Sequence, residues 1–186
     1  MKAALLIVDV INRLDFEGAE ALIEPALRMA ERLAALRERA DRAGVPVIYV
    51  NDNFDDWERD FSALVDDIVE RDLPGRPLVE LLRPRAGDLH ILKPRHSGFH
   101  STPLEILLAR LEVDRLVICG LQTHICVLFT AHAAHMRDYE IVVPGDCCAA
   151  ETRADHEAAL RLLSSGLDIE VRGSDEIDPF TIALAD

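Results

Sequence analysis

The sequence has no apolar run of membrane-spanning length, and it carries few basic residues for its size. Its 20 Lys and Arg stand against 34 Asp and Glu, which gives a formal net charge of −14 at pH 7. That acidity argues against nucleic acid or an anionic membrane surface as a partner. The first residues also lack the pattern of a secretory signal peptide. We therefore expect a cytoplasmic protein whose partner is a small molecule.

The sequence also has few cysteines, and it lacks the glycine expected in a phosphate-binding loop after the first strand. The four cysteines at positions 119, 126, 147 and 148 show no C-x-x-C spacing, so we expect reduced thiols. Segment 9–13 follows the first apolar run and has no glycine, which argues against a nucleotide-binding module with a phosphate loop. At 186 residues, the chain is most simply one domain spanning 1–186.

Short apolar runs alternate with helical patterns along the chain. In the first helical pattern, apolar residues from Leu22 to Ala40 recur at steps of three and four, and Gly44 is a plausible stop. The alternation predicts an α/β fold of three layers (α/β/α), Rossmann-like, with a mostly parallel six-stranded sheet. The predicted strands are residues 3–8, 45–50, 89–92, 116–119, 140–143 and 167–171. Residues 175–186 could wrap this domain or a partner subunit.

Three reactive side chains follow predicted strands. Asp9 ends the first strand, Lys93 follows the third and Cys126 lies just beyond the fourth. Because sites in open α/β sheets form outside the carboxyl ends of the strands, we expect these groups to meet. There the carboxylate could take the thiol proton, and the ammonium would favour the thiolate.

The segment from Cys119 to Val127 carries the nucleophile. Thr123 is a candidate N-cap, which would place Cys126 in the first helical turn. Free backbone N–H groups and the helix dipole favour negative charge there, so we expect a lowered thiol pKa. The same N–H groups could stabilise an oxyanion.

Four segments carry a resemblance to a known family, in that family's order: Leu5-Leu6-Ile7-Val8-Asp9, Lys93 with Ser97-Gly98-Phe99, Gly120 through Val127, and Val142-Val143-Pro144 with Asp146. On these motifs the chain resembles the isochorismatase-like, or cysteine hydrolase, superfamily. This superfamily includes nicotinamidases, N-carbamoylsarcosine amidases and ureidoacrylate amidohydrolases. The resemblance implies that Asp9 is the general base and acid, Lys93 the charge-stabilising partner and Cys126 the nucleophile. It also implies a homodimer or higher homo-oligomer.

The same resemblance implies an oxyanion hole. In the family, a cis peptide bond precedes the residue that matches Gln122, and the backbone N–H groups of Gln122 and Cys126 would hold the oxyanion. Such a bond costs about 3–4 kcal/mol at a non-proline residue, so it would be strain retained for function.

Two departures from the family narrow the expected chemistry. Nicotinamidases hold a metal with an Asp-x-His pair after the second strand, but here that stretch is Asn51-Asp52-Asn53. We therefore expect no metal and no cofactor, and nicotinamide is a poor candidate substrate. Ile11 stands where the family often has Gln, which indicates an altered pocket. Members that act on isochorismate lack the cysteine, so Cys126 favours attack on a C–N bond.

The sequence thus predicts a cysteine hydrolase of a small amide, ureido or carbamoyl compound that works through a thioester intermediate. Two alternatives remain: an inactive family member that serves as an assembly or binding subunit, and a thiol redox or sensor protein in which Cys126 pairs with another cysteine. Residues expected to line the substrate pocket are Asn12, Phe16, Trp57, His96, Phe99 and His124.

Overall fold

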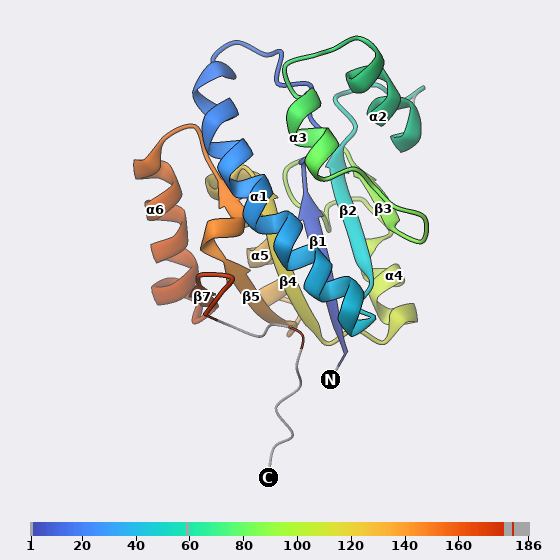
Figure 1. The fold of residues 1–186 in the computed structure, drawn as a ribbon. Helices are drawn as coiled ribbons and strands as arrows, with labels where there is room; N and C mark the ends of the chain where they lie inside the picture. Colours follow the sequence, from blue (N-terminus) through green and yellow to red (C-terminus); the bar gives the residue numbers. More distant parts are fainter. Residues whose placement is uncertain (1, 59, 177–179, 181–186) are drawn as a thin grey trace.

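A parallel β-sheet forms the centre of the computed structural model, which describes residues 2–58, 60–176 and 180 (Figure 1). The strand order is β3-β2-β1-β4-β5-β7, and the short β6 also pairs with β4. Every pairing is parallel. The strands are β1 (Ala3–Val8), β2 (Val47–Asp52), β3 (Leu89–Lys93), β4 (Arg115–Leu121), β5 (Glu140–Pro144), β6 (Cys148–Ala149) and β7 (Glu170–Arg172).

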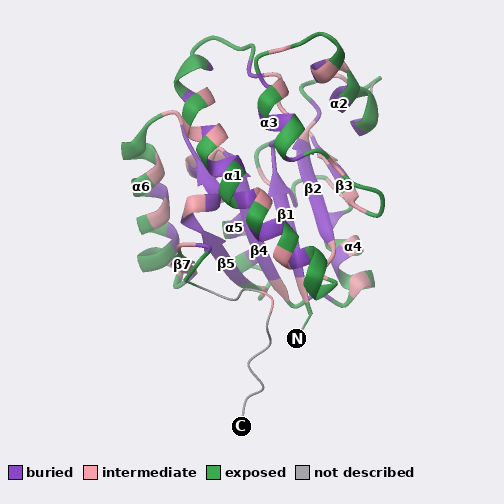
Figure 2. Ribbon diagram, in the orientation of Figure 1, coloured by how far each residue is buried: buried purple, intermediate pink, exposed green. Residues whose placement is uncertain are grey.

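The apolar strand runs are buried on both faces, as a covered parallel sheet requires. Residues 4–8 of β1 and 116–121 of β4 are buried, and Figure 2 shows the sheet as the buried centre of the molecule. The predicted three-layer fold is therefore confirmed. The predicted number of strands was one too low, because β6 contains only two residues and leaves no pattern in the sequence.

The helices divide into two layers around two hydrophobic clusters. One cluster packs under α1 (Glu20–Ala43), α2 (Phe61–Glu70) and α3 (Arg76–Leu81). The other packs under α4 (Leu104–Leu111) and α5 (Leu128–His135) and includes the segment that follows α6 (Arg153–Arg161). Shorter turns are the π-helical segments Thr123–Val127 and Leu162–Gly166 and the 3-10 turn Gly145–Cys147.

The chain changes direction across the sheet between β1 and β4. From β1 it proceeds outward through β2 to β3, and from β4 it proceeds the other way through β5 to β7. The connecting helices therefore lie on opposite faces of the sheet on the two sides of this boundary. In open α/β sheets such a switch point is where ligands bind, outside the carboxyl ends of the strands, so we expect the site at the ends of β1 and β4.

Local signals in the sequence explain some of the helix ends. The apolar face predicted for α1 is buried from Leu22 to Ala40, and Gly44 ends the helix in the left-handed conformation at φ 67°. Thr152 caps α6 by accepting the backbone N–H of Asp155. Helix α3 was not predicted, because the prolines and the glycine of segment 73–77 resemble a breaker. In the structure, Pro77 lies inside the first turn of α3.

No helix within the described residues is long and apolar enough to cross a membrane. Most of the segment 175–186, for which we predicted wrapping, lies outside the described residues.

Candidate active site

Asp9 leaves the end of β1 in a strained conformation. Its φ is 51°, a left-handed value that is uncommon for residues other than glycine but tolerated by Asp. Its backbone N–H donates to the carbonyl of Val50 on β2 at 3.0 Å, and its Oδ1 accepts the backbone N–H of Asp52 at 2.6 Å. These bonds to the neighbouring strand hold the carboxylate over the carboxyl end of the sheet.

Lys93, the last residue of β3, reaches this carboxylate from two strands away. Its side chain is fully buried, and its Nζ lies 2.9 Å from Oδ2 of Asp9. Burial alone lowers the pKa of the ammonium, but the Asp9 carboxylate, together with Cys126 and Asp52, outweighs burial and raises that pKa. Burial raises the pKa of the Asp9 carboxyl group, and the Lys93 ammonium opposes that shift. The pair is therefore a buried ammonium bound to a carboxyl group that is ready to accept a proton.

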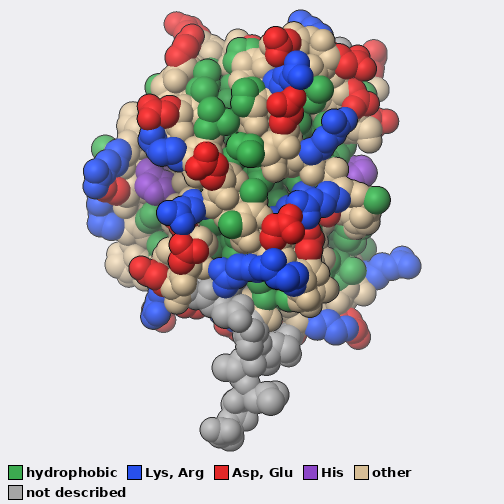
Figure 3. All heavy atoms as spheres, viewed as in Figure 1, with side chains coloured by type: hydrophobic (Ala, Val, Ile, Leu, Met, Phe, Trp, Pro, Cys, Tyr) green, Lys and Arg blue, Asp and Glu red, His purple; other side chains and the backbone are tan. Residues whose placement is uncertain are grey.

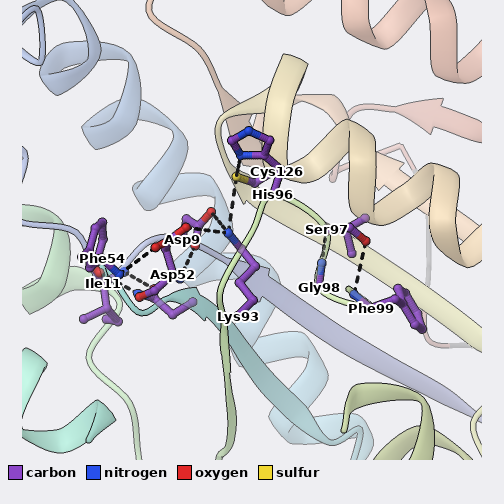
Figure 4. A network of polar contacts seen from close by, with 12 residues as sticks. Asp9, Ile11, Asp52, Phe54, Lys93, His96, Ser97, Gly98, Phe99 and Cys126 are labelled. Atoms are coloured by element: carbon purple, nitrogen blue, oxygen red, sulfur yellow. Dashed lines mark hydrogen bonds and ion pairs between the residues drawn. The ribbon is translucent and has the colours of Figure 1, made fainter. Parts of the chain in front are cut away.

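Cys126 completes the cluster from the π-helical turn after β4. Its Sγ lies 3.5 Å from Nζ of Lys93, the ammonium that is paired with the Asp9 carboxylate (Figure 4). The residue is 9% exposed. The structure thus brings the three predicted catalytic side chains together from β1, β3 and the turn after β4.

The predicted cap of this turn was wrong. The helical segment starts at Thr123 itself, with Gln122 as the N-cap. The Thr123 hydroxyl bonds instead to Nδ1 of His156 on α6 at 2.8 Å. Cys126 still lies in the first turn, as expected, and Gln122 is joined to the start of α6 by a bond from its Nε2 to Glu151.

The predicted direction of the thiol pKa was also wrong. Burial and the Asp9 carboxylate raise the pKa of Cys126, and these effects exceed the lowering by Lys93. The resting site therefore holds a thiol rather than a preformed thiolate. Sequence spacing predicts the helix turn and the nearby cation, but it does not reveal how deeply the thiol is buried or how strongly the Asp9 carboxylate acts on it.

The peptide bond before Gln122 differs from the one that the resemblance implies. No cis peptide bond occurs among the described residues, so the Leu121–Gln122 bond is trans. The carbonyl of Gln122 accepts the N–H groups of Ile125 and Val127 at 3.0 and 3.2 Å, which starts the turn that carries Cys126.

Of the predicted pocket residues, His96 lies against the nucleophile. Its Nδ1 is 4.0 Å from Sγ of Cys126, and its ring packs 5.8 Å from the ring of Phe129. Figure 4 shows the sulfur between the His96 ring and the Lys93 ammonium. His96 is exposed, so it borders the open side of the thiol.

Within the described part of the chain, the other predicted pocket residues make no hydrogen bond or ion pair with Asp9, Lys93 or Cys126. Phe99 is buried against Tyr139 and under Arg137, in the same hydrophobic cluster as Cys126, and its place in a substrate pocket stays a prediction. The other four lie in the following places. Asn12 caps its own loop at the N–H of Leu14, Phe16 and Trp57 are 40% and 76% exposed, and His124 has a buried Nδ1 without a partner.

Sequence reasoning missed two polar residues at the end of β2. Oδ2 of Asp52 lies 3.3 Å from Nζ of Lys93. The side chain of Asn51 is fully buried and bonds both the N–H and the carbonyl of Ile11, at 3.1 and 3.0 Å. Asn51 thereby fixes the loop after Asp9. The available signal was their position at a strand end beside β1, but we interpreted them only as the remains of a metal motif.

The structure also shows how the possible metal ligands and the four cysteines are arranged. Within the described residues, no three or more His, Cys, Asp or Glu side chains form a group that could hold a metal ion. All four cysteines are free and buried. Cys119 and Cys147 pack in the cluster under α1, whereas Cys126 and Cys148 pack in the cluster on the other face.

Comparison with known proteins shows the family to which the chain belongs. A family model described as the isochorismatase domain matches residues 3–171. The chain is 34% identical over 174 residues to the uncharacterised isochorismatase family protein YaaI of Bacillus subtilis, covering 94% of this chain and 95% of that protein.

Two solved structures show the same fold. N-carbamoylsarcosine amidase from Thermoplasma acidophilum superimposes with a TM-score of 0.74 at 29% identity, covering 96% of this chain and 99% of that one. The nicotinamidase/pyrazinamidase PncA of Bacillus subtilis gives a TM-score of 0.71 at 26% identity, covering 92% and 100%.

Proposed function

Because the chain belongs to the isochorismatase family of hydrolases, we propose that it cleaves a C–N bond of a small amide, ureido or carbamoyl compound through a thioester on Cys126. One observation carries this proposal: the Cys126 thiol contacts the Lys93 ammonium, which is itself paired with the Asp9 carboxylate. The structural neighbour that hydrolyses a carbamoyl compound has the same fold and 29% identity, which supports the substrate class.

In the first half-reaction, the thiol proton passes to the Asp9 carboxylate as Sγ attacks the substrate carbonyl carbon. An S–C bond forms, and the carbonyl π electrons move to oxygen. The N–H groups at the start of the Cys126 turn, with those of Gln122 and Cys126 as candidates, stabilise this oxyanion. The C–N bond then breaks, and the proton on Asp9 passes to the leaving amine.

In the second half-reaction, water replaces the amine. Asp9, ionised again, takes a proton from water as the hydroxyl oxygen attacks the thioester carbon. The C–S bond breaks as the carbonyl re-forms, and Asp9 gives the proton that it took from water to the departing sulfur. Lys93 stays positively charged throughout and stabilises each negative intermediate in the buried site.

The raised thiol pKa suits this sequence of steps. A resting thiol gives its proton to Asp9 only when a carbonyl carbon is present to accept the sulfur electrons. The carboxyl group of Asp9, whose pKa is raised by burial, is suited to hold a proton between the two transfers.

We also propose that the protein is cytoplasmic and forms a homodimer or higher homo-oligomer. Size-exclusion chromatography with light scattering would test the oligomeric state.

Loss of the sulfur is the decisive test. Small neutral amides, ureido compounds and carbamoyl compounds would be screened for ammonia release, and the acyl-enzyme would be trapped by acid quench and found by mass spectrometry. We expect Cys126→Ala to abolish both signals, a loss of at least about 10³-fold. Cys148→Ala, a buried cysteine that does not contact Lys93, is the control and should retain activity. Hydrolysis by folded Cys126→Ala would contradict the proposal, and inactivity of the wild type on the whole panel would favour a non-catalytic subunit.

A further inference from the structure

The buried ammonium of Lys93 has two carboxylate partners. Oδ2 of Asp9 lies 2.9 Å from Nζ, and Oδ2 of Asp52 lies 3.3 Å from it. The strand register explains the second contact, because Asp52 on β2 pairs directly with Lys93 on β3. With both carboxyl groups ionised, two negative charges face one positive charge before the thiol has lost a proton.

Asp52 is also fixed in place by hydrogen bonds. Its backbone N–H donates to Oδ1 of Asp9 at 2.6 Å, and its Oδ1 accepts the N–H of Phe54 at 2.7 Å. Figure 4 shows Asp52 beside Asp9, with its carboxylate turned toward Lys93. Asp52 therefore binds the general base through its backbone and the ammonium through its side chain.

The charge balance changes during the reaction that we propose. When Asp9 takes the thiol proton it becomes neutral, and the ion pair between Asp9 and Lys93 is lost. A buried ammonium without a counter-ion is costly, and its pKa would fall. Asp52 is then the carboxylate that remains on Lys93 within the described residues, so Lys93 keeps its charge while the oxyanion forms.

The same contact acts on the resting thiol. The charged and titratable groups around Sγ are Asp9 from β1, Lys93 from β3 and His96 from the loop after β3. Asp52 from β2 acts through Lys93. The Lys93 ammonium, 3.5 Å from Sγ, already has two carboxylate partners. A thiolate would be a third negative group next to this one cation, so the ionised form of Cys126 is disfavoured.

We propose that Asp52 is a positioning residue, the second counter-ion of Lys93, which keeps the Cys126 thiol protonated at rest and keeps Lys93 charged while Asp9 holds the proton. This inference rests on the proposed function for the second role only. The first role concerns the resting protein and needs no substrate.

Asp52→Asn tests both roles with little change of shape, because the amide oxygen can still accept the N–H of Phe54. Alkylation of Cys126 by iodoacetamide would be followed across pH by peptide mass spectrometry. We expect Asp52→Asn to react about five- to tenfold faster than wild type at neutral pH, as a fall in thiol pKa of up to about one unit would give. Once an amide substrate has been identified, kcat of Asp52→Asn should be at least about tenfold lower than that of the wild type, with little change in KM.

The matched control is Asp55→Asn. Asp55 is exposed, lies in the loop that follows Asp52 and has a left-handed φ of 56° that Asn also tolerates. Its replacement changes the net charge by the same amount, so it should alkylate at the wild-type rate. An alkylation profile of Asp52→Asn that matches wild type and Asp55→Asn would overturn the proposal.

Two further points keep the test decisive. If Asp52→Asn does not fold, Asp52→Ala replaces it, and added formate should return the faster alkylation toward the wild-type rate; absence of both effects would overturn the role of Asp52. Failure of the proposed function would be seen in a different measurement, the hydrolysis assay. Hydrolysis that survives in Cys126→Ala would end the thioester mechanism without changing the alkylation comparison.

Discussion

At the scale of single residues, the pKa of the Cys126 thiol responds to two neighbouring groups of opposite charge. The ammonium of Lys93 stabilises a thiolate, whereas the carboxylate of Asp9 and burial disfavour it, and the net result is a raised thiol pKa. An enzyme with this balance gains protection from chance alkylation or oxidation, because the thiolate is the reactive form. It then depends on Asp9 to remove the proton at the moment of attack.

This balance predicts the pH dependence of thiol reactivity. Because the pKa of Cys126 is raised, its thiolate fraction at neutral pH lies below that of a free cysteine and grows about tenfold per pH unit below the pKa. We expect log-linear growth of the iodoacetamide rate between about pH 7 and 9, without a plateau. Lys93→Met removes the stabilising charge and should slow alkylation further. A plateau near neutral pH in the wild type would instead indicate a preformed thiolate.

The sequence predicts the position of some of these residues and not of others, because some positions follow from strand ends and others from strand register or burial. Asp9, Lys93 and Cys126 follow strands, and the rule for strand ends of parallel sheets is enough to bring them together. Asp52 needs the register of β2 against β3, which is set by packing across the sheet and has no local signature. The direction of the thiol pKa needs burial and distances, which the sequence does not contain.

At the scale of elements, the nucleophile turn is positioned by the close approach of β4 to β1. Gly120 has φ 117°, and a Cβ there would lie 2.1 Å from the carbonyl oxygen of Val8. Residues other than glycine are excluded at this position, because the positive φ is unfavourable for them and because a Cβ would clash with Val8. The end of β4 therefore passes directly beside the end of β1, which brings the Cys126 turn to Asp9.

Gly120→Ala tests this geometry. The added methyl group must push β4 away from Val8, so we expect the free energy of unfolding to fall by about 2–4 kcal/mol and catalytic activity to fall with it. Gly173→Ala is the control, because a Cβ there meets only ordinary contacts with Glu176 at 3.6 Å. Urea denaturation of both variants measures the difference. Equal stability of the two would show that β4 can shift without cost.

Elements with strong local patterns were predicted well, and elements fixed by tertiary contacts were not. The face of α1 and the cap at Thr152 follow from periodicity and from a side-chain hydrogen bond within four residues. Thr123 has the same local pattern as a cap, but His156 on α6 takes its hydroxyl. A partner 33 residues away thus overrides the local preference.

At the scale of the whole molecule, the surface carries many charged side chains of both signs, with an excess of negative charge. Figure 3 shows acidic and basic side chains interspersed over the face that carries α1. Many of them form pairs, such as Arg85 with Asp41 at 2.5 Å and Arg76 with Glu80 at 2.7 Å. Exposed pairs of this kind contribute little to stability, about 0–1 kcal/mol each. They leave an uncompensated charge of −14, which gives the protein a negative field toward any approaching ligand.

That field predicts a difference between two reagents of nearly equal size. Iodoacetate is anionic and iodoacetamide is neutral, and both alkylate Cys126 by the same displacement. The net charge and the two carboxylates on Lys93 repel the anion, so the rate ratio of iodoacetate to iodoacetamide should be at least about threefold lower at Cys126 than at a free thiol in low salt. Raising the ionic strength from about 0.01 to 0.5 M screens the repulsion and should raise the ratio, with little effect on iodoacetamide alone. The same repulsion would select neutral amides over carboxylate-bearing ones of equal shape. A ratio that falls as salt rises would mean that positive groups govern the approach to the sulfur, and anionic substrates would then be the better candidates.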